Sequence, residues 1–523
     1  MKILLISPYT FWKGENEFQV LKQRNFNENL GIRYIASSLE QRGHTVDIID
    51  AHFEEIDDIR EQGIITDGYD VYGITFVEAI LEEMLSIVRH IKELKHNANI
   101  VIGGYGATFL GKQLVVDCPD ICAAVVSEGE KTSVELFEAI YEREKWPDIK
   151  GIIFAENGKT IATKPRALIH DIDSLPWPSR GALYKHPRAN ILASRGCYGK
   201  CTYCSISEFY GRFEGSNVRI RRAKSVVDEM EYVANTFGVH YFDFVDDNFT
   251  CTCNKNMAWA VEFVEEIKHR NLKITWGIQA RANDIDYDLF TILYDGGLRV
   301  VSVGIENDVP RVINMLKTGT TKEIHRRAID ILKRIGINMY IEMILLEPTS
   351  SLSEIRENLD FLYEIDFSNL HRQNPITFST KLHLYIGTPV VKQMQERGLV
   401  WTEKYHVHYN FQDKKVQLLS DILIKWQEKT ASLATYQLSY FQYEAGSKGD
   451  YGLAMKIMKL SRKYLKLDLD FYSSVVDRLI NDDEVKVVGD VEDVFALFHE
   501  QSLEIGEKFN RIVKRVLLKG VSD

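Results

Sequence analysis

Three cysteines on one short loop constrain this chain more than any other feature of its sequence. They are Cys197, Cys201 and Cys204, spaced C-x3-C-x2-C, and they follow the apolar run ANILAS at residues 189–194. The run predicts a buried β-strand, so we expect the cysteines on the loop beyond the carboxyl end of that strand. Open parallel α/β sheets bind their ligands at this end. The loop is therefore the first candidate for a functional site.

The spacing of the three thiols favours an iron–sulfur cluster. Thiolate is the usual ligand of such clusters, and three thiolates can hold three irons of a cubane 4Fe-4S cluster. The fourth iron then keeps an open position, where a small molecule can bind and react. Two alternatives stay open from the residues alone: a zinc site, which calls for four closed ligands, and three unrelated thiols. Cys251 and Cys253 lie further on, and their C-x-C spacing predicts ordinary loop or core thiols, with a role near the cluster or substrate as the alternative.

Length and charge restrict the classes of protein to which the chain can belong. Its 523 residues are enough for two or three domains. The formal net charge of −11 argues against nucleic acid as the main partner, which calls for a basic face. We find no apolar run long enough to span a bilayer, and MKILLISPY is too short for a signal peptide. The seven cysteines do not suggest a disulfide framework, so we expect a cytoplasmic, reducing compartment.

Residues 1–145 alternate short apolar strands with amphipathic helices. Strands are predicted at KILLIS, TVDIID, DVYGITF, ANIVIGG and AAVVSEG. This order predicts an α/β domain with a doubly wound parallel sheet, which binds ligands in its carboxyl-end crevice. Two of the strands end at Gly103-Gly104 and at Ser127-Glu128-Gly129-Glu130. From spacing alone, both stretches predict tight turns.

The rest of the chain divides into three parts. Residues 146–188 hold five of the 11 prolines and a predicted hairpin around Asn157-Gly158, and we expect a stiff connector. Residues 189–395 repeat the strand–helix alternation in six units, which are too few for a closed eight-stranded barrel and suit a partial one. Residues 396–523 carry mainly helical patterns and predict either a helical core packed on the barrel or a lid over its mouth. Aromatic residues are dense there, around Tyr436, Tyr440, Phe441 and Tyr443.

Polar side chains gather where the predicted strands of the barrel end. Asp246-Asp247-Asn248 ends the second strand, Gln279 and Arg281 end the third, and Glu306-Asn307 ends the fourth. Each set has a local explanation, because Asp and Asn cap helices well and arginine pairs with carboxylates. Equivalent positions at several strand ends are nevertheless where barrel-like folds carry their chemistry. We therefore expect a binding site at this edge.

With these motifs in place, the chain resembles a known family. The C-x3-C-x2-C loop, with an aromatic residue before its last cysteine, is similar to the signature of radical S-adenosylmethionine (SAM) enzymes. The resemblance implies that the open iron chelates the amino and carboxylate groups of SAM, and that the reduced cluster cleaves SAM to a 5′-deoxyadenosyl radical. FVDDNFT, WGIQARAND and VSVGIEN also match one large subfamily. By resemblance, Arg281 pairs with the SAM carboxylate, while Glu306 and Gln279 bind ribose hydroxyls or the amino group. The complete set of implied SAM contacts is Tyr203, Asp247, Gln279, Arg281 and Glu306.

The first domain resembles the cobalamin-binding domain of the same subfamily, on the stretches LGIRYIASSLEQRGHTVDIID, YGIT, IVIGGYGAT and VVSEGEKTSVELF. The chain departs from the pattern at Tyr105, where the family often has histidine. It also lacks the Asp-x-His-x-x-Gly motif for a lower ligand, since Asp50-Ala51-His52 follows the second strand and has no such glycine. The resemblance implies cobalamin contacts from Thr75, Gly103, Gly104, Ser127, Gly129 and Glu130.

Three functions follow from these patterns. The leading one is a cobalamin-dependent radical SAM methyltransferase that acts on an unactivated carbon of a small molecule or peptide, with a reducing electron donor as a second partner. In the implied mechanism, one SAM methylates cobalamin and a second yields the radical that abstracts hydrogen. The second hypothesis keeps the radical chemistry without cobalamin, for a rearrangement, ring closure or carbon–carbon coupling. The third is a non-enzymatic iron–sulfur or zinc protein. The sequence names neither the substrate nor a catalytic residue beyond these cofactor contacts.

Overall fold

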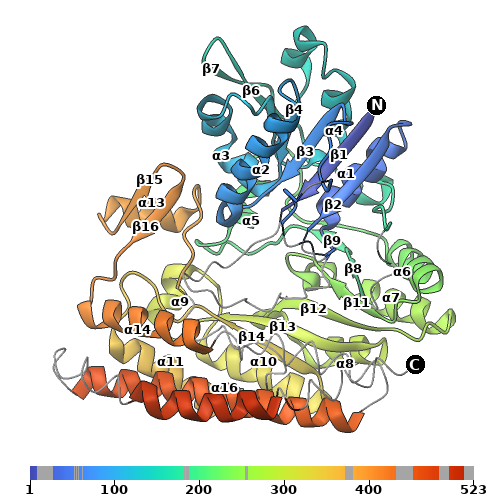
Figure 1. Ribbon diagram of the computed structural model, residues 1–523. Coiled ribbons are helices and arrows are strands. Elements are labelled where there is room, and N and C mark those ends of the chain that lie inside the picture. Colours follow the sequence, from blue (N-terminus) through green and yellow to red (C-terminus); the bar gives the residue numbers. More distant parts are fainter. Residues whose placement is uncertain are drawn as a thin grey trace.

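The computed structural model holds two α/β sheets and a helical region that follows them (Figure 1). The carboxyl ends of the two sheets line a shared crevice. The residues that the structure describes are 1–8, 28–51, 53, 54, 56, 58–61, 63–181, 183, 188–253, 257–370, 381–430, 451–481, 494–509 and 511.

The N-terminal sheet has the strand order β2-β1-β3-β4-β5-β6-β7. The first five strands pair in parallel, and β6 and β7 add an antiparallel hairpin beside β5. The hairpin predicted in the connector is thus part of this sheet, while the domain bounds given above stay a prediction. The strands are β1 (Lys2–Ser7), β2 (Thr45–Asp50), β3 (Val71–Thr75), β4 (Asn99–Gly103), β5 (Ala123–Val125), β6 (Ile152–Glu156) and β7 (Lys159–Ala162).

Helices cover both faces of this sheet, which confirms the predicted doubly wound fold. α1 (Leu30–Glu40) and α4 (Gly129–Glu138) pack on one face, and α2 (Leu81–Leu94) and α3 (Gly104–Asp117) pack on the other. Burial on both sides explains the nearly continuous apolar strand sequences, such as KILLIS in β1. Because α3 and α4 begin at glycines just after β4 and β5, their amino termini lie at the carboxyl edge of the sheet.

The second sheet consists, within the described residues, of five parallel strands in the order β14-β13-β12-β11-β8. The first four residues of the sixth predicted strand, TFSTKLHLY, lie outside the described ranges, and Lys381 makes a parallel bridge to Leu346. The strands are β8 (Arg188–Ile191), β11 (Tyr241–Phe244), β12 (Thr275–Arg281), β13 (Leu298–Glu306) and β14 (Asn338–Met343). The helices that share a core with them are α6 (Ala223–Phe237), α7 (Met257–His269), α8 (Tyr287–Asp295), α10 (Lys322–Ile335) and α11 (Leu352–Glu364).

Smaller elements position the cysteine loop. β9 (Ser194–Arg195) pairs antiparallel with β10 (Arg219–Ile220) and leads into the loop, and α5 (Ser205–Gly211) follows its last cysteine. The remaining short helices are η1 (Glu78–Ile80), η2 (Arg143–Asp148), η3 (Ile172–Ser174), η5 (Phe249–Thr252), η6 (Ala282–Asp284), α9 (Pro310–Leu316) and α12 (Phe367–Leu370).

The C-terminal region packs on helices that follow the second sheet. The long helix α16 (Tyr451–Asn481) contacts α11, α12 and α14 (Lys414–Thr430), and it runs along the bottom of Figure 1. This packing agrees with the predicted helical core, whereas the aromatic positions Tyr436, Tyr440, Phe441 and Tyr443 lie outside the described residues. In the ranges described, none of the helices combines the length and apolarity needed to cross a bilayer.

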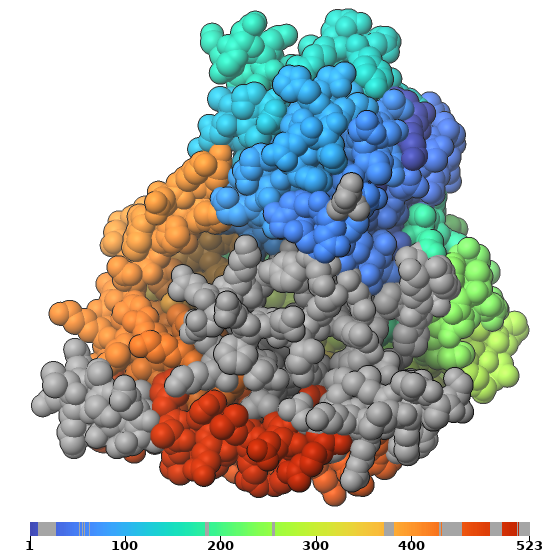
Figure 2. Space-filling model, viewed as in Figure 1, coloured from blue at the N-terminus to red at the C-terminus, as the bar shows by residue number. Residues whose placement is uncertain are grey.

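A hairpin from the C-terminal half reaches back to the N-terminal domain. It follows α13 (Pro389–Glu396) and consists of β15 (Val400–Glu403) and β16 (His406–Tyr409). The hydroxyl of Tyr405, at its turn, donates to Asp117 Oδ2 at 2.7 Å, at the end of α3. Figure 2 shows this orange segment beside the blue N-terminal domain. The two halves of the chain are therefore in contact away from the crevice as well.

Candidate functional site

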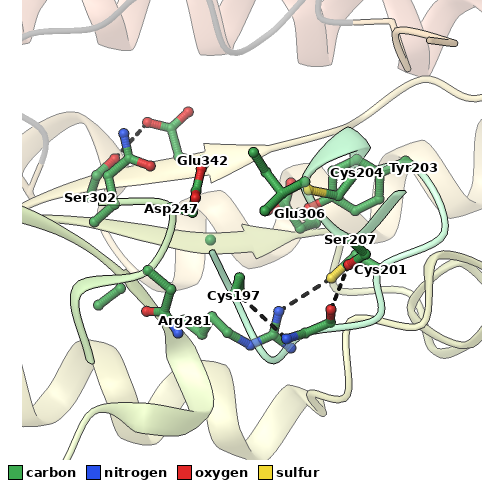
Figure 3. Close-up of a pocket in the computed structure, with 16 residues that line it drawn as sticks. Cys197, Cys201, Tyr203, Cys204, Ser207, Asp247, Arg281, Ser302, Glu306 and Glu342 are labelled. Carbon is green, nitrogen blue, oxygen red and sulfur yellow. Dashed lines mark hydrogen bonds between the residues drawn. The ribbon is translucent and has the colours of Figure 1, made fainter. Parts of the chain in front are cut away.

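The cysteine loop and the ends of the second sheet enclose a cavity of about 340 Å³ (Figure 3). Cys197, Cys201 and Cys204 all line it. Thr202 fixes the middle of the loop, because its N–H donates to the Leu316 carbonyl at 2.8 Å and its hydroxyl donates to the neighbouring carbonyl at 2.9 Å. The three thiols thus face one space.

Arg281 places a positive charge beside these thiols. Its Nη1 lies 3.3 Å from Cys201 Sγ, as Figure 3 shows, and its Nη2 donates to the Thr318 carbonyl. Burial raises the pKa of Cys201 and also that of Cys204, in the latter case to about 12. A nearby cation or a bound metal favours the thiolate form against this effect of burial. Arg281 therefore supports metal binding by the loop.

Cys251 is a further neighbour of the loop, in agreement with the alternative that the sequence left open for this cysteine. The two thiols share a hydrogen bond, and this contact is the first cause that lowers the pKa of Cys197 below its ordinary value. The N–H of Gly199 also donates to Cys197 Sγ, at 3.3 Å. Cys253 instead lies in the hydrophobic core, with its sulfur 3.0 Å from Thr252 Oγ. Cys253 is thus an ordinary core thiol, and Cys251 is not.

The arrangement of the thiols suits a cluster better than one metal ion. Among the described residues, no three His, Cys, Asp or Glu side chains come close enough together to hold a single ion. Zinc draws its ligands onto one centre at about 2.0–2.3 Å, whereas each thiolate of a cubane cluster binds a different iron. A donor set of three separate thiols around one cavity therefore fits a 4Fe-4S cluster.

The residues that the resemblance assigns to SAM are brought together by the fold. They come from the cysteine loop and from the ends of β11, β12 and β13, where barrel-like folds place their functional groups. All of them line the cavity that holds the three thiols: Tyr203, Asp247, Gln279, Arg281 and Glu306. Their individual contacts with SAM stay a prediction.

Three further polar side chains in the lining were not among the predicted site residues: Ser207, Ser302 and Glu342. Ser302 Oγ donates to Glu342 at 2.8 Å. Ser302 lies four residues before Glu306 on β13, so the two side chains share one face of the strand. The alternation of that strand is the signal that would have found it. Ser207 lies on α5, and no pattern in the sequence indicated that this helix would line the cavity.

Glu306 has an unusual backbone conformation. Its φ is +65°, in the left-handed region that non-glycine residues rarely adopt, and the register between β13 and β14 shifts at this point. The hydroxyl of Tyr203 hydrogen-bonds to the carboxylate, and burial together with the charge of Glu342 raises the pKa of Glu306 to about 7. Backbone strain of this kind gathers at functional sites.

The two aspartates after β11 hold different parts of the loop. Asp246 accepts a hydrogen bond from Ser194 Oγ at 2.6 Å and so ties the end of β11 to β9. Asp247 Oδ2 accepts the N–H of Gly196 at 2.8 Å, one residue before the first cysteine. Burial raises the pKa to about 7 for Asp246 and to about 6 for Asp247.

A second cavity, of about 470 Å³, lies between the carboxyl ends of the two sheets. Its walls come from β1, β3 and β4 on one side and from the ends of β8 and β11 on the other. Asp247 lines both this crevice and the cavity of the cysteines, so the two spaces adjoin at that residue. The crevice is also lined by every residue that the resemblance assigns to cobalamin: Thr75, Gly103, Gly104, Ser127, Gly129 and Glu130.

The crevice walls carry polar atoms that the described protein leaves without a hydrogen-bond partner. These buried atoms include Ser127 Oγ, Glu130 Oε2 and Asn190 Oδ1. Leaving such a group unsatisfied costs about 1–3 kcal/mol, so a ligand with hydrogen-bonding groups suits this space. Cobalamin carries amide groups around its corrin ring, and each amide offers both donors and an acceptor. The residues present therefore fit that cofactor.

Tyr105, at the position where the family often has histidine, lies in the wall of the crevice. Its ring packs on Phe209 of α5 with 4.3 Å between ring centroids, and its hydroxyl hydrogen-bonds to Tyr210. Burial, with Asp247 nearby, holds the pKa of Tyr105 well above its ordinary value. The substitution thus adds a contact between the N-terminal domain and the helix after the cysteines. His52, of the lower-ligand lookalike, is outside the described residues.

Two family models match the chain one after the other. The B12 binding domain matches residues 20–137, and the Radical SAM superfamily matches residues 191–362. The chain is a radical SAM enzyme with an N-terminal B12-binding domain. The cofactors typical of this family are a 4Fe-4S cluster, SAM and cobalamin. Membership decides against the zinc and non-enzymatic alternatives.

Sequence relatives of this radical SAM enzyme include named methyltransferases and cyclases. An uncharacterized methyltransferase from Pyrococcus horikoshii is 29% identical over 375 residues, which are 70% of this chain and 78% of the relative. The anaerobic magnesium-protoporphyrin IX monomethyl ester cyclase of Rubrivivax gelatinosus is 30% identical over 372 residues, 66% of this chain and 64% of the cyclase.

Among solved structures, the cobalamin-dependent S-adenosylmethionine radical enzyme OxsB with aqua-cobalamin bound has a TM-score of 0.72 at 16% identity, covering 100% of this chain and 80% of OxsB. The radical S-adenosylmethionine methyltransferase TsrM from Kitasatospora setae has a TM-score of 0.59 at 19% identity, covering 77% and 76%. At these identities, the likeness establishes a shared fold.

Proposed function

We propose that this radical SAM enzyme methylates an unactivated carbon of its substrate in a cobalamin-dependent reaction. The observation that carries the proposal is that the crevice and the cavity of the cysteines adjoin at Asp247. A methyl group and a radical have to reach the same substrate atom, so their sources must stand next to each other. Two separate sites would not support this chemistry.

The chain's own residues would hold three groups in this arrangement. Cys197, Cys201 and Cys204 would bind the cluster, and the SAM and cobalamin contacts would be those predicted from the resemblance. When bound, the cluster supplies the electron for SAM cleavage and cobalamin supplies a carrier for the methyl group.

Arg281 and Glu306 have separate tasks in this proposal. The Arg281 guanidinium is anchored at the Thr318 carbonyl and at Cys201 Sγ, so it is oriented before SAM arrives. A fixed guanidinium binds a carboxylate with little loss of side-chain entropy. The Glu306 carboxylate, which Tyr203 holds by a hydrogen bond, would accept hydrogen bonds from ribose hydroxyls or from the amino group of SAM.

A second candidate is a radical ring closure instead of methyl transfer. The relative from Rubrivivax gelatinosus, at 30% identity, is named as a cyclase, whereas other relatives are named methyltransferases, including a hopanoid C-3 methylase. Both candidates share the cluster and SAM. They differ in what becomes of the methyl group of SAM.

The products of SAM separate the two candidates. The protein, reconstituted anaerobically with iron and sulfide, is given SAM and dithionite, with and without hydroxocobalamin. We expect S-adenosylhomocysteine only when cobalamin is bound, and 5′-deoxyadenosine in both samples. If 5′-deoxyadenosine is the sole product, the methyltransferase proposal is wrong. Cys201→Ala is the control. It should form no 5′-deoxyadenosine, because it removes a proposed cluster ligand. It should still retain cobalamin, because the predicted cobalamin contacts lie in the N-terminal domain.

A further inference from the structure

Four buried charged residues join residues 128–130, which line the crevice and are called its lip, to the strand that carries the cysteine loop. Arg195 Nη1 donates to Glu128 at 2.7 Å, and its Nη2 donates to Glu130 at 2.5 Å. Arg219 Nη1 donates to the two oxygens of Glu128 at 2.8 and 2.7 Å. Each of the four residues is at most 9% exposed. We call Glu128, Glu130, Arg195 and Arg219 the interdomain charge cluster.

The positions of these residues in the chain connect the two cofactor sites. Glu128 and Glu130 flank Gly129, which lines the crevice and begins α4. Arg195 ends β9, two residues before Cys197. A movement of the crevice lip would therefore be passed through Arg195 to the cysteine loop. Glu130, which the resemblance assigns to cobalamin, has one carboxylate oxygen committed to Arg195.

The pairing of β9 with β10, which places the two arginines side by side, depends on the carboxylates of the N-terminal domain. Arg195 and Arg219 stand directly opposite each other in the antiparallel pair β9–β10. Like charges in such a pair repel, and here the two glutamates compensate them. Burial alone would raise the pKa of Glu128, but the charges of Arg195 and Arg219 hold that pKa below its ordinary value. The carboxylate of Glu128 is therefore ionised at neutral pH.

Buried charges are a poor means of stabilising a domain contact, because their desolvation offsets most of their attraction. Apolar side chains would hold the two domains together as firmly. Four charges with fixed hydrogen-bond geometry instead select one relative position of the two surfaces. Arg195 can meet both Glu128 and Glu130 in only one placement of the crevice over the loop.

We propose that the interdomain charge cluster sets the position of the cobalamin crevice relative to the cysteine loop, with Arg195 as the positioning residue. The proposal rests on the proposed function only where it concerns bound cobalamin. In this proposal, Glu130 Oε1 makes the contact between the domains, and only Glu130 Oε2 remains for the cofactor.

Glu229 provides a matched control. It is 1% exposed and also has two arginine partners, Arg180 at 2.8 Å and Arg221 at 2.6 Å. It lies on α6 and is not among the residues that line either cavity. Glu229→Gln therefore removes a buried charge of the same kind without contacting Glu128, Glu130 or the cysteine loop. Because its partner Arg221 directly follows β10, the two variants are compared at residues 194–204.

Hydrogen–deuterium exchange tests the proposal without cobalamin. Wild type, Glu130→Gln and Glu229→Gln are compared with the cluster loaded and cobalamin absent. We expect exchange within residues 194–204 to rise about tenfold in Glu130→Gln, as the loss of a charge-assisted hydrogen bond implies, and to stay unchanged in Glu229→Gln. Unchanged exchange in Glu130→Gln, or an equal rise in both variants, would overturn the proposal. Arg195→Lys serves as a milder second variant, because a lysine cannot bridge two carboxylates as an arginine fork does.

Pulsed electron paramagnetic resonance (EPR) then measures the positioning itself. The distance between the reduced cluster and bound cobalamin in its paramagnetic Co(II) form is recorded for the same proteins. We expect one narrow distance distribution in wild type and in Glu229→Gln, and a broadened one in Glu130→Gln and Arg195→Lys. Identical distributions in all four proteins would refute the positioning role. If wild type retains no cobalamin, the proposed function fails at that point, and the exchange measurement still decides the role of the charge cluster.

Discussion

The carboxylate of Asp247 accepts the backbone N–H of Gly196 at 2.8 Å, and the same side chain lines both cavities. One residue therefore holds the start of the cysteine loop and forms the boundary between the two cavities. Its pKa, raised to about 6 by burial, leaves it mostly ionised at neutral pH. A carboxylate is thus available on the wall that SAM and cobalamin would share.

Asp247→Ala should reduce cluster incorporation. The variant leaves the Gly196 N–H without its acceptor, which costs about 1–3 kcal/mol, and it frees the loop just before Cys197. Asp247→Asn keeps an oxygen acceptor and should load iron nearly as wild type does. Iron and sulfide per chain after anaerobic reconstitution measure the difference. Equal iron content in the alanine variant and wild type would show that this hydrogen bond does not hold the loop.

Binding of SAM should strengthen as pH rises through about 7, the pKa to which burial raises Glu306. Below this pH the side chain is a neutral acid, and above it is a carboxylate, which accepts hydrogen bonds about twice as strongly. The sign for folding is the opposite: because the pKa is raised in the folded state, ionisation of Glu306 lowers the stability of the fold as pH rises.

The pH effect can be followed by the change that SAM causes in the EPR spectrum of the cluster, between pH 6 and pH 8.5. Glu306→Gln should flatten this dependence and weaken SAM binding about tenfold at high pH, in line with the loss of one charged hydrogen bond. The same pH dependence in Glu306→Gln as in wild type would remove Glu306 from the set of SAM contacts.

The parts of this structure that the sequence predicts are those set by local pattern. KILLIS has the unbroken apolar run of a strand buried on both faces, and it forms β1 over Lys2–Ser7. Arg281 and Glu306 are polar residues at the ends of predicted strands, and parallel strands bring such ends to one edge. The grouping of these residues with the three cysteines follows from the same rule.

The parts that it does not predict depend on contacts between distant segments. Arg195 and Glu128 are 67 residues apart and belong to different domains, so no local pattern pairs them. Cys251 meets Cys197 only because η5 folds back onto the cysteine loop. The left-handed backbone of Glu306 arises from a register shift between β13 and β14, which depends on how two strands pair.

Two neighbouring glycines should separate ligand contact from backbone strain. A Cβ added to Gly103 meets no atom within 4 Å, so the protein itself has room for a side chain there. Gly104 has a φ of +86°, and a Cβ there would come within 2.6 Å of Thr75 Oγ. Gly103→Val should therefore weaken retention of cobalamin at least tenfold with a smaller loss in the thermal unfolding midpoint than Gly104→Ala, because the added Cβ meets the ligand and not the protein. Gly104→Ala should lower both.

Cobalamin retained after desalting, measured by absorbance, is the readout for these variants, and iron content is the control, since the cysteines lie in the other domain. Full retention in Gly103→Val would place the cofactor elsewhere than on this edge of β4.

Removal of the Cys251 thiol should lower the reduction potential of the cluster. A hydrogen bond to a ligating sulfur stabilises the more negative, reduced state, and the Cys251 thiol, which shares a hydrogen bond with Cys197, would donate to Cys197 once Cys197 is a thiolate. A bond of about 0.5–1.5 kcal/mol corresponds to a shift on the order of 20–60 mV for a one-electron couple. Cys251→Ser keeps a donor and should lie between alanine and wild type, while Cys253→Ala, whose sulfur faces the core, should leave the potential unchanged. An EPR-monitored redox titration measures all four proteins. A shift of equal size in Cys253→Ala would show that the effect comes from a disturbed η5 and not from the hydrogen bond. A loss of iron in Cys251→Ala would instead show that Cys251 is a ligand.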